Sequence, residues 1–418
     1  MNQSLENIIE FVEEFDIEQI QITDSIEEKS PDLGIGSSDK PITRDHIWFS
    51  PVSPSYPPSY DYNYYLDGVQ QTVITKLIRF SEYKVPLHLA HIAAGIMFRN
   101  PKNGLLEPTT KVSFRVLLGP FRTLEKKANT RFRIDKDFNF SSSGNIYTKI
   151  TQQPPDSFFV SDTSLKFSQN DNKIDSSVLG QMGLIRSNAL SRVRVLRTIL
   201  ELGLAMEFVT ENPSKKLIID GPLVNLETYK RLVSKKYLKI LNSYRLKFQF
   251  LKSIIGSVKT VIRLPNKVAQ DLLNSTRECS NIFVWNLNDV TSDFSRHLGS
   301  VILSAIFQLR PSLLAILPDI SSGYSALVRF DIPIPAIIPP ESDLDSCESL
   351  SLTSQEILSN NLCNSNFKKV LSSILSERWI YPQKNSHRSL VELFPIEQIE
   401  KWLISTLDSP FKLKSIIN

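Results

Sequence analysis

The sequence predicts an α/β protein in which a mixed β-sheet is flanked by helices, with inserted loops and a helical arm at the amino terminus. Short apolar runs rich in β-branched residues end at Gly, Pro or Asp, which is typical of strands that run into turns. Residues 188–210 instead repeat apolar side chains at helical spacing. Hydrophobic residues make up 41% of the 418 positions, which is enough for a substantial core around such a sheet.

The first 63 residues are predicted to form an arm and a linker outside this core. Residues 4–22 place apolar side chains at helical spacing among glutamates, which predicts an amphipathic helix. Residues 24–63 lose this periodicity and collect six prolines with many Ser and Asp residues. The predicted units are an acidic amphipathic helix at 1–23, a proline-rich linker at 24–63 and a compact domain at 64–418.

The compact domain is predicted to begin with an antiparallel meander and to continue with helices and further strands. Residues 122–182 are polar and are expected to form loops with short strands. The predicted strands are 64–67, 73–80, 87–98, 112–118, 217–220, 251–258 and 326–334. The predicted helices are 188–210, 225–246, 264–275, 296–309, 354–378 and 388–407.

Charge is distributed unevenly along the chain. Residues 1–45 hold 12 acidic and 3 basic residues, whereas residues 186–267 hold 17 basic and 5 acidic residues. A basic body predicts a polyanionic ligand such as nucleic acid, although a solvated lysine-rich helix face would give the same composition. The absence of an 18-residue apolar run, of signal-peptide order and of closely spaced cysteines predicts a cytoplasmic protein without a membrane span.

Two aspartates stand at the ends of predicted strands. Asp67 ends the run YYLD, Asp220 ends the run LIID, and glycine follows both. Because the carboxyl ends of strands border the ligand crevice of open α/β sheets, these positions favour chemistry. The structural alternative is that each aspartate only begins an ordinary Asp-Gly turn.

The helix before Asp220 is expected to supply a third carboxylate. Glu201 lies on its apolar side, four residues after Arg197, where a carboxylate is costly to bury without a compensating cation. Glu207 is the alternative, closer to Glu211 and to solvent. A strand ending in Asp, a meander, a helix with Glu and a second strand ending in Asp are the order expected of a ribonuclease-H-like metal nuclease. In such a site two divalent ions, Mn²⁺ or Mg²⁺, activate water and stabilise the leaving oxygen.

Six motifs in this order resemble the NurA nucleases of archaea and some bacteria, and together they span roughly 64–395. The first three motifs are Leu66-Asp67-Gly68, with Val69 where the family usually has Ser; the helix through Arg197 and Glu201; and the strand at 217–223, similar to the family's Asp-Gly-x-Leu strand. The fourth is the strand at 254–259, similar to its Gly-x-Val-Lys strand. The last two are Arg329-Phe330-Asp331-Ile332-Pro333, with Asp for the usual Glu, and Tyr381-Pro382 followed by His387.

The resemblance implies a ribonuclease-H-like fold, a homodimer with a central channel and manganese-dependent cleavage of DNA. The implied activity is a 5′-to-3′ exonuclease with some single-strand endonuclease activity, and the implied partner is a hexameric HerA-type ATPase. The residues that carry over as metal ligands are Asp67, Glu201, Asp220 and His387. For His387 the resemblance also allows the alternative role of a proton shuttle. Tyr381 would position a phosphate or a water, and Lys259 and Arg197 would bind the substrate.

Ordinary structural roles compete with several of these assignments. His387 would otherwise be a surface histidine, Tyr381 a core residue and Lys259 a solvated lysine at a strand end. Asp331 would be either an accessory ligand or a partner for Arg329. His88 and His91 are three residues apart on a predicted strand, which places them on opposite faces and disfavours a zinc pair.

The sequence therefore predicts a metal-dependent DNA nuclease that works with a HerA-type translocase in DNA end processing or phage defence. The alternative is a catalytically inactive nucleic-acid-binding subunit with the same fold. A nucleotide phosphotransferase is disfavoured because no Gly-rich phosphate-binding loop is present. The acidic arm is expected to dock a partner or to be autoinhibitory.

Overall fold

The computed structural model describes the greater part of the chain in separate ranges. These are residues 16–18, 47–49, 62–80, 82–128, 145–154, 157–164, 179–223, 226, 229, 232–259, 282–286, 302–308, 327–339, 354–377 and 393–416. Among these residues no helix is both long and apolar enough to cross a membrane.

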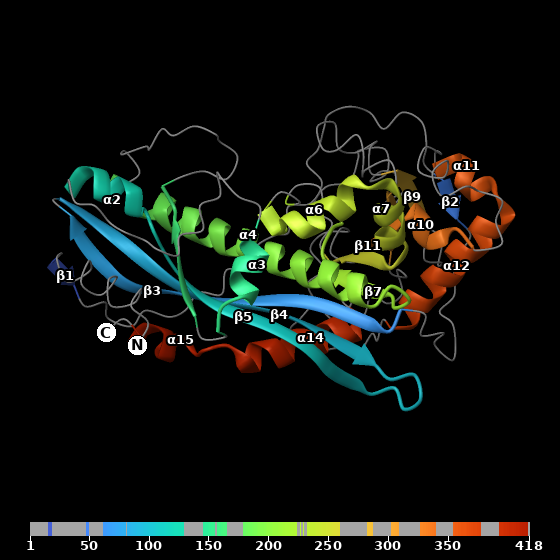
Figure 1. The fold of residues 1–418 in the computed structure, drawn as a ribbon, viewed down its shortest axis with the longest axis horizontal. Coiled ribbons are helices and arrows are strands. Elements are labelled where there is room, and N and C mark those ends of the chain that lie inside the picture. Colours follow the sequence, from blue (N-terminus) through green and yellow to red (C-terminus); the bar gives the residue numbers. More distant parts are fainter. Residues whose placement is uncertain are drawn as a thin grey trace.

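One mixed sheet contains all eleven of the described strands, so the chain is an α/β protein (Figure 1). The order across the sheet is β2-β9-β10-β11-β8-β7-β3-β4-β5-β6, and β1 pairs with β3 beside this path. The strands are β1 (Asp16–Glu18), β2 (Ile47–Phe49), β3 (Tyr64–Phe80), β4 (Tyr83–Arg99), β5 (Leu106–Gly119), β6 (Phe158–Asp162), β7 (Leu217–Asp220), β8 (Ile254–Val258), β9 (Ile282–Asn286), β10 (Ile302–Gln308) and β11 (Leu327–Pro333).

Helices cover both sides of this sheet. In Figure 1 α4 runs along the upper side of the long strands, and α14 and α15 lie along the lower side. The described helices are α2 (Phe121–Ala128), α3 (Ile146–Thr151), α4 (Met182–Glu211), α6 (Lys235–Asn242), α7 (Tyr244–Lys252), α10 (Ile334–Ile337), α11 (Ser354–Ser359), α12 (Asn361–Ser376), α14 (Phe394–Thr406) and α15 (Pro410–Ser415).

The predicted meander is confirmed, but residues 64–67 and 73–80, predicted as two strands, form the single strand β3. Asp67 therefore lies near the start of a strand and does not end one, because its backbone continues to pair with β4. β3, β4 and β5 pair antiparallel in chain order, while β7 pairs parallel with β3 and β8 pairs parallel with β7. Alternate residues of β3 enter different cores because successive side chains of a strand point to opposite faces. Leu66 packs in the core beneath α4, and Tyr65 packs in the core on the α14 side.

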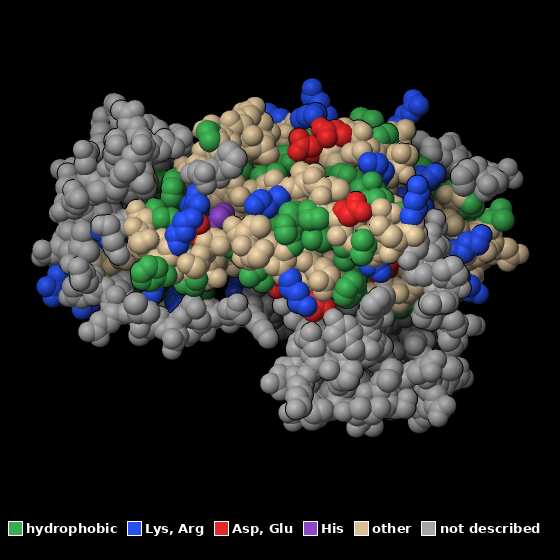
Figure 2. Space-filling view, turned by 90° about the horizontal axis from the view of Figure 1, so that it is seen from below, with side chains coloured by type: hydrophobic (Ala, Val, Ile, Leu, Met, Phe, Trp, Pro, Cys, Tyr) green, Lys and Arg blue, Asp and Glu red, His purple; other side chains and the backbone are tan. Residues whose placement is uncertain are grey.

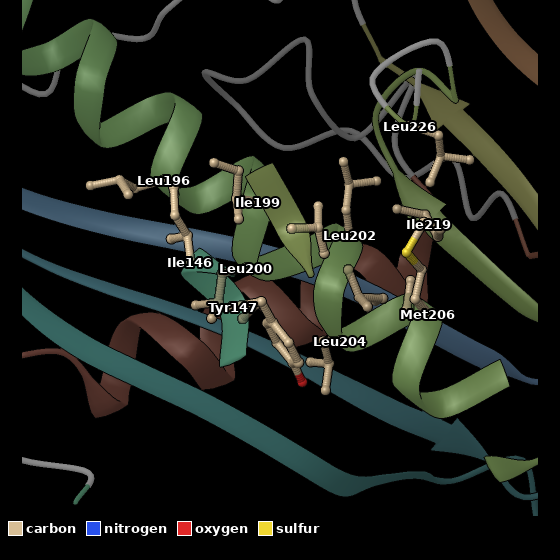
Figure 3. Packing of buried hydrophobic residues seen from close by; sticks show 14 of the residues in the cluster. Ile146, Tyr147, Leu196, Ile199, Leu200, Leu202, Leu204, Met206, Ile219 and Leu226 are labelled. Carbon is tan, nitrogen blue, oxygen red and sulfur yellow. The ribbon is translucent and has the colours of Figure 1, made fainter. Parts of the chain in front are cut away.

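The helix predicted at 188–210 is confirmed as α4, which is 30 residues long. Its apolar side chains, among them Leu196, Ile199 and Leu200, pack against the sheet and against Ile146 and Tyr147 of α3 (Figure 3). This packing fixes α4 along β3 and β4 and therefore fixes where the carboxylates of the helix lie.

Strand β3 loses its parallel partner next to Asp67. β7 pairs with β3 only over residues 64–66, and β1 pairs with β3 only over residues 77–79. Between these segments, over residues 67–76, β3 has no partner on that side among the described strands. Within the described part of the chain, this edge of β3 is therefore unpaired immediately beyond the last β3–β7 pair, and we call this unpaired edge the notch.

The structure corrects several predictions of secondary structure. Residues 122–182, predicted as loops with short strands, contain α3 and nearly all of α2, and the helix predicted at 225–246 is interrupted at Ser243 between α6 and α7. Residues 47–49, predicted as part of the linker, pair with β9 as β2. Residues 302–308, predicted as part of a helix, form strand β10 between β9 and β11, because its backbone pairs with both neighbours and the side chains of residues 302–305 are buried. Residues 16–18, predicted as part of the amphipathic helix, pair with β3 as β1. Helix α7 extends to Lys252, so the strand predicted at 251–258 begins only at Ile254. The helix predicted at 264–275 lies outside the described residues.

Candidate functional site

Asp67 and Asp220 lie side by side where the parallel pairing of β3 and β7 ends. Leu66 of β3 pairs with Ile219 of β7, so the two aspartates are the next residues on neighbouring strands. Tyr65, two residues before Asp67, packs in the core on the α14 side. Because residues two apart on a strand share a face, both aspartates project toward that side. The register thus brings together two carboxylates that are 153 residues apart in sequence.

Asp67 is held in an environment that disfavours its charge. Only 4% of its surface is exposed. Burial, and then the neighbouring Asp220, raise the pKa of Asp67 well above the ordinary value, while Lys259 acts in the opposite direction. The backbone N–H of Gly68 donates to its Oδ1 over 2.7 Å. A buried carboxylate crowded by other carboxylates is the electrostatic arrangement that a bound cation relieves.

Asp220 is more open than Asp67 and already has one cation beside it. Lys259 Nζ lies 3.0 Å from Asp220 Oδ2, and the two side chains are 9% and 20% exposed, respectively. The other oxygen, Oδ1, is buried and has no hydrogen-bond partner in the described part of the chain. Asp220 therefore offers one paired and one unpaired oxygen at the notch.

The turn after Asp220 is fixed by two backbone contacts. Gly221 adopts a φ of 107°, which favours glycine, and its N–H donates to the carbonyl of Ser257 over 2.7 Å. The N–H of Leu223 donates to Asp331 Oδ2 over 3.1 Å. A Cβ at Gly256 would lie 2.7 Å from the carbonyl oxygen of Gly221, so the close approach of this turn requires glycine at position 256.

Asp331 has a structural role in this arrangement. It is fully buried, accepts a hydrogen bond from Ser304 Oγ over 2.8 Å, and lies 3.0 Å from Arg329 Nε. Asp331 pairs with Gly256 of β8, whereas Asp220 pairs with the next residue, Ser257. Because successive residues of a strand face opposite sides, Asp331 and Asp220 project to opposite faces of the sheet. Of the two roles expected for Asp331, the structure shows the partner of Arg329.

Glu201 approaches the notch from the other face of the sheet. It projects from α4, where only 8% of its side chain is exposed, and Arg197 Nε lies 3.2 Å from its Oε1, as expected for residues one helical turn apart. A Cβ on Gly68 would lie 2.2 Å from Glu201 Oε1, so the carboxylate rests directly on the backbone after Asp67. Glu201 also raises the pKa of Asp67, after burial and Asp220.

The structure distinguishes Glu201 from the alternative carboxylate of the same helix. Glu207 accepts a hydrogen bond from the hydroxyl of Tyr147 on α3, and burial followed by this bond raises the pKa of Tyr147. Glu207 is therefore used in the packing of α3 on α4, whereas Glu201 is the helix carboxylate at the notch.

The predicted ligand set is only partly assembled in the described structure. Asp67 and Asp220 share one face, but Glu201 lies on the other, and the described residues contain no group of three or more His, Cys, Asp or Glu side chains placed to hold a metal ion. The physical reason is the two-residue alternation of β3, which points Asp67 away from α4 and leaves Gly68 facing that helix. Tyr381 and His387 lie outside the described residues.

Sequence reasoning missed two residues of this neighbourhood. Glu400 on α14 is another acidic group that raises the pKa of Asp67. Its spacing from the buried residues Ile396 and Leu403, four before and three after, places it on the side of α14 that faces the sheet. Ser257 pairs with Asp220 in the parallel register of β7 and β8. The helical spacing around Glu400 was visible in the sequence, but the register that selects Ser257 was not.

Lys and Arg side chains do not form one broad patch on the side of the molecule shown in Figure 2. That view, from the side of α14 and α15, shows Lys and Arg side chains scattered between hydrophobic and other side chains. At the notch itself, Lys259 and Arg197 are the cations that the structure pairs with the predicted carboxylates.

The chemistry of the donors fits a hard divalent cation. Asp67 and Asp220 share one face, burial and then Asp220 raise the pKa of Asp67, and a buried oxygen of Asp220 has no partner among the described groups. Oxygen ligands without a cysteine are those preferred by Mg²⁺ and Mn²⁺. In the described structure Lys259 and Arg197 pair with Asp220 and Glu201, respectively. No protein-family model matches this chain, and no curated protein has a similar sequence.

Proposed function

We propose that this protein is a metal-dependent deoxyribonuclease of the NurA type. The observation that carries the proposal is the adjacency of Asp67 and Asp220 at the end of the β3–β7 pairing, with the raised pKa of Asp67. A carboxylate with a raised pKa, beside a second carboxylate at the end of a parallel strand pair, is an arrangement enriched at catalytic sites.

A ribonuclease-H-like core is part of this proposal. Support comes from the segment β5-β4-β3-β7-β8, in which an antiparallel meander is followed, through the long helix α4, by two parallel strands beside the first strand of the meander. The carboxylates then stand on the first strand, the intervening helix and the fourth strand, which is the order that the sequence motifs predict.

Asp67, Asp220 and Glu201 would hold two divalent ions, Mn²⁺ or Mg²⁺, with His387 as a further ligand or proton shuttle. Such ions supply Lewis acidity and an activated water for the hydrolysis of a phosphodiester. Lys259 and Arg197 would neutralise the phosphate that enters the notch, and Tyr381 would position it. Glu201 lies against Gly68 on the opposite face, so it would have to turn around the edge of β3 to join Asp67 and Asp220 on one ion.

The proposed substrate is DNA, cut as a 5′-to-3′ exonuclease and as a single-strand endonuclease. The proposed setting is the cytoplasm, in a homodimer that receives DNA from a HerA-type hexameric ATPase during end processing or phage defence. These assignments rest on the six sequence motifs and on the basic composition of residues 186–267.

A catalytically inactive nucleic-acid-binding subunit is the second candidate function. It is favoured by the ion pairs at the notch, because Lys259 and Arg197 neutralise Asp220 and Glu201 without a metal. In an active nuclease these cations would exchange from the carboxylates to the phosphate when metal and DNA bind.

Incubation of the purified protein with end-labelled DNA tests the proposal, with Mn²⁺, with Mg²⁺ and with chelator. The nuclease should release labelled nucleotides only with a divalent ion, and Asp220→Asn should abolish cleavage. Mn²⁺ at a hundred times its dissociation constant should stabilise the wild-type fold by about 2.7 kcal/mol. Most of that gain should be lost in Asp220→Asn.

Glu397→Gln is the matched control, because Glu397 pairs with Lys401 on an exposed part of α14. It should behave as the wild type in both assays. DNA binding that is unaffected by Mn²⁺, without cleavage and without stabilisation, would instead establish the inactive subunit.

A further inference from the structure

Two oxygen atoms without hydrogen-bond partners lie on neighbouring strands at the notch. Asp220 of β7 and Ser257 of β8 are partners in the parallel register, so their side chains project from the same face. Asp220 Oδ1 and Ser257 Oγ are both buried, and neither has a hydrogen-bond partner among the described groups. Ser257 is only 1% exposed.

A buried hydroxyl without a partner is unusual. Most buried polar side-chain atoms in folded proteins are satisfied, and each exception calls for an explanation such as a bound ion or water. Alanine or glycine at position 257 would avoid the cost of desolvating the hydroxyl. Other hydroxyls of the described structure, such as that of Ser161, are also buried without a partner. Ser257 differs from them because it lies beside the unpartnered Oδ1 of Asp220, which a shared ligand would explain.

We propose that Ser257 belongs to the divalent-cation site, where its hydroxyl holds the hydration shell of a cation bound by Asp220 Oδ1. This inference rests on the proposed function and extends it by one residue. Because Lys259 occupies Asp220 Oδ2, the unpaired Oδ1 is the oxygen left for the cation. Ser257 Oγ accepts from, or donates to, water molecules that remain on the ion.

A hydrated cation fits these two oxygens better than a phosphate does. A carboxylate oxygen repels a phosphate but attracts both a metal ion and the hydrogens of its coordinated water. Mg²⁺ releases its waters reluctantly and is usually held by one or two carboxylates with several waters retained. A hydroxyl next to the carboxylate supplies the outer contact that such waters need.

The test compares Ser257→Ala with Ser161→Ala. Ser161 of β6 is also fully buried with an unpartnered Oγ in the described structure, but it lies at the far end of the sheet. In chelator both variants should unfold at the wild-type temperature or above it, since each loses a buried unsatisfied hydroxyl. Titration with Mn²⁺ alone, followed by the melting temperature, should show at least a tenfold weaker dissociation constant for Ser257→Ala only. Ser257→Thr, which keeps the hydroxyl, should restore the wild-type constant.

Each result supports or overturns the inference. An unchanged dissociation constant for Mn²⁺ in Ser257→Ala overturns it. The proposed function then still stands if Asp220→Asn has lost the rise in melting temperature with Mn²⁺. Equal weakening in Ser161→Ala, or a loss of stability in chelator for Ser257→Ala, shows a structural hydroxyl and also overturns it. A wild-type protein that does not respond to Mn²⁺ removes the proposed function and this inference together.

Discussion

The environment of Asp67 differs from that of an ordinary surface carboxylate. Burial and the adjacent Asp220 raise its pKa, so the folded protein binds a proton at this site at pH values where the unfolded chain has released it. By linkage, this contribution to stability is fully present below the unfolded-state pKa. It is lost as pH rises through the higher pKa of the folded state.

The first prediction concerns Asp67→Asn, which cannot ionise. In chelator the free energy of unfolding of the wild-type protein should fall as pH rises above the ordinary aspartate range, and the variant should lack this fall. Mn²⁺ should reverse the fall in the wild type, because a bound cation stabilises the ionised pair. Urea denaturation across pH measures both effects. An unchanged pH dependence in Asp67→Asn would contradict the assignment.

The second prediction concerns Asp331, which connects the turn after Asp220 to a buried arginine. Asp331→Ala leaves Arg329, which is 2% exposed, without its carboxylate. Removal of one partner of a buried ion pair typically costs about 3–5 kcal/mol. Chemical denaturation in chelator measures this loss. The control is Lys401→Ala, which breaks an exposed pair and should cost at most about 1 kcal/mol. Similar small losses in both variants would refute the structural role.

The residues of the site differ in how far the sequence could predict them. Asp67 and Asp220 were predictable, because both end apolar runs and precede glycine. The position of Glu201 on the opposite face, and the position of Ser257 beside Asp220, were not predictable. Both depend on which residues of β3, β7 and β8 lie in register. A shift by one residue would exchange the faces, and nothing local in the sequence fixes that choice.

At the scale of the elements, strand β4 carries two buried histidines with different surroundings. They project to opposite faces, as predicted, and so cannot form a zinc pair. The N–H of Asp408 donates to His91 Nδ1 over 3.0 Å. Neither ring nitrogen of His88 has a partner among the described groups. Burial, and then nearby Arg186, lower the pKa of His88 to about 4.

The third prediction is that His88→Leu stabilises the protein at pH 7. The neutral imidazole is desolvated without compensation, and leucine removes that cost of about 1–3 kcal/mol. Because the folded pKa of about 4 lies below the unfolded value of 6.5, protonation favours unfolding as pH falls through this window. The variant should lose that part of the acid sensitivity. Thermal denaturation between pH 7 and pH 4 measures both changes.

His91→Leu provides the control for that experiment. It removes the acceptor for the N–H of Asp408 and should therefore destabilise the fold at pH 7. If His88→Leu destabilises the protein by a similar amount, His88 has a polar partner and the prediction is wrong.

Element types were predictable where the sequence period was long and unambiguous. The long helix α4 and the meander strands followed from periodicity, whereas strand β10 was mistaken for a helix. Its sequence, ILSAIFQ, is a short run that is almost wholly apolar, and such a run fits a buried strand and a buried helix equally well. Only its neighbours β9 and β11, which complete its backbone hydrogen bonds, decide between them.

At the scale of the whole molecule, β3 joins the parts of the protein. Its 17 residues contribute to all three hydrophobic clusters, through Leu66, Tyr65 and Ile78, and carry Asp67 between them. A single sheet with helices on both sides was predictable from the alternation of elements. The notch along residues 67–76 of β3 was not predictable, because it depends on where along β3 the pairing with β7 ends and the pairing with β1 begins.

The last prediction concerns the acidic arm, and the variant lacks residues 1–45. This deletion removes β1, which pairs with β3 at only three positions, whereas β4 pairs with β3 along almost its whole length. The truncated protein should therefore fold and retain metal-dependent cleavage. Because the removed segment holds 12 acidic and 3 basic residues, affinity for DNA should rise, most strongly at low salt.

Filter binding to single-stranded DNA over a range of salt concentrations measures this change. A full-length control in which Glu6, Glu10, Glu13 and Glu14 are replaced by glutamine separates charge from the physical presence of the arm. It should reproduce part of the gain in affinity if repulsion is the cause, and none if the arm occludes the site sterically. A truncated protein that fails to fold would show instead that the arm belongs to the core. The three residue pairs between β1 and β3 would then be indispensable to the eleven-stranded sheet.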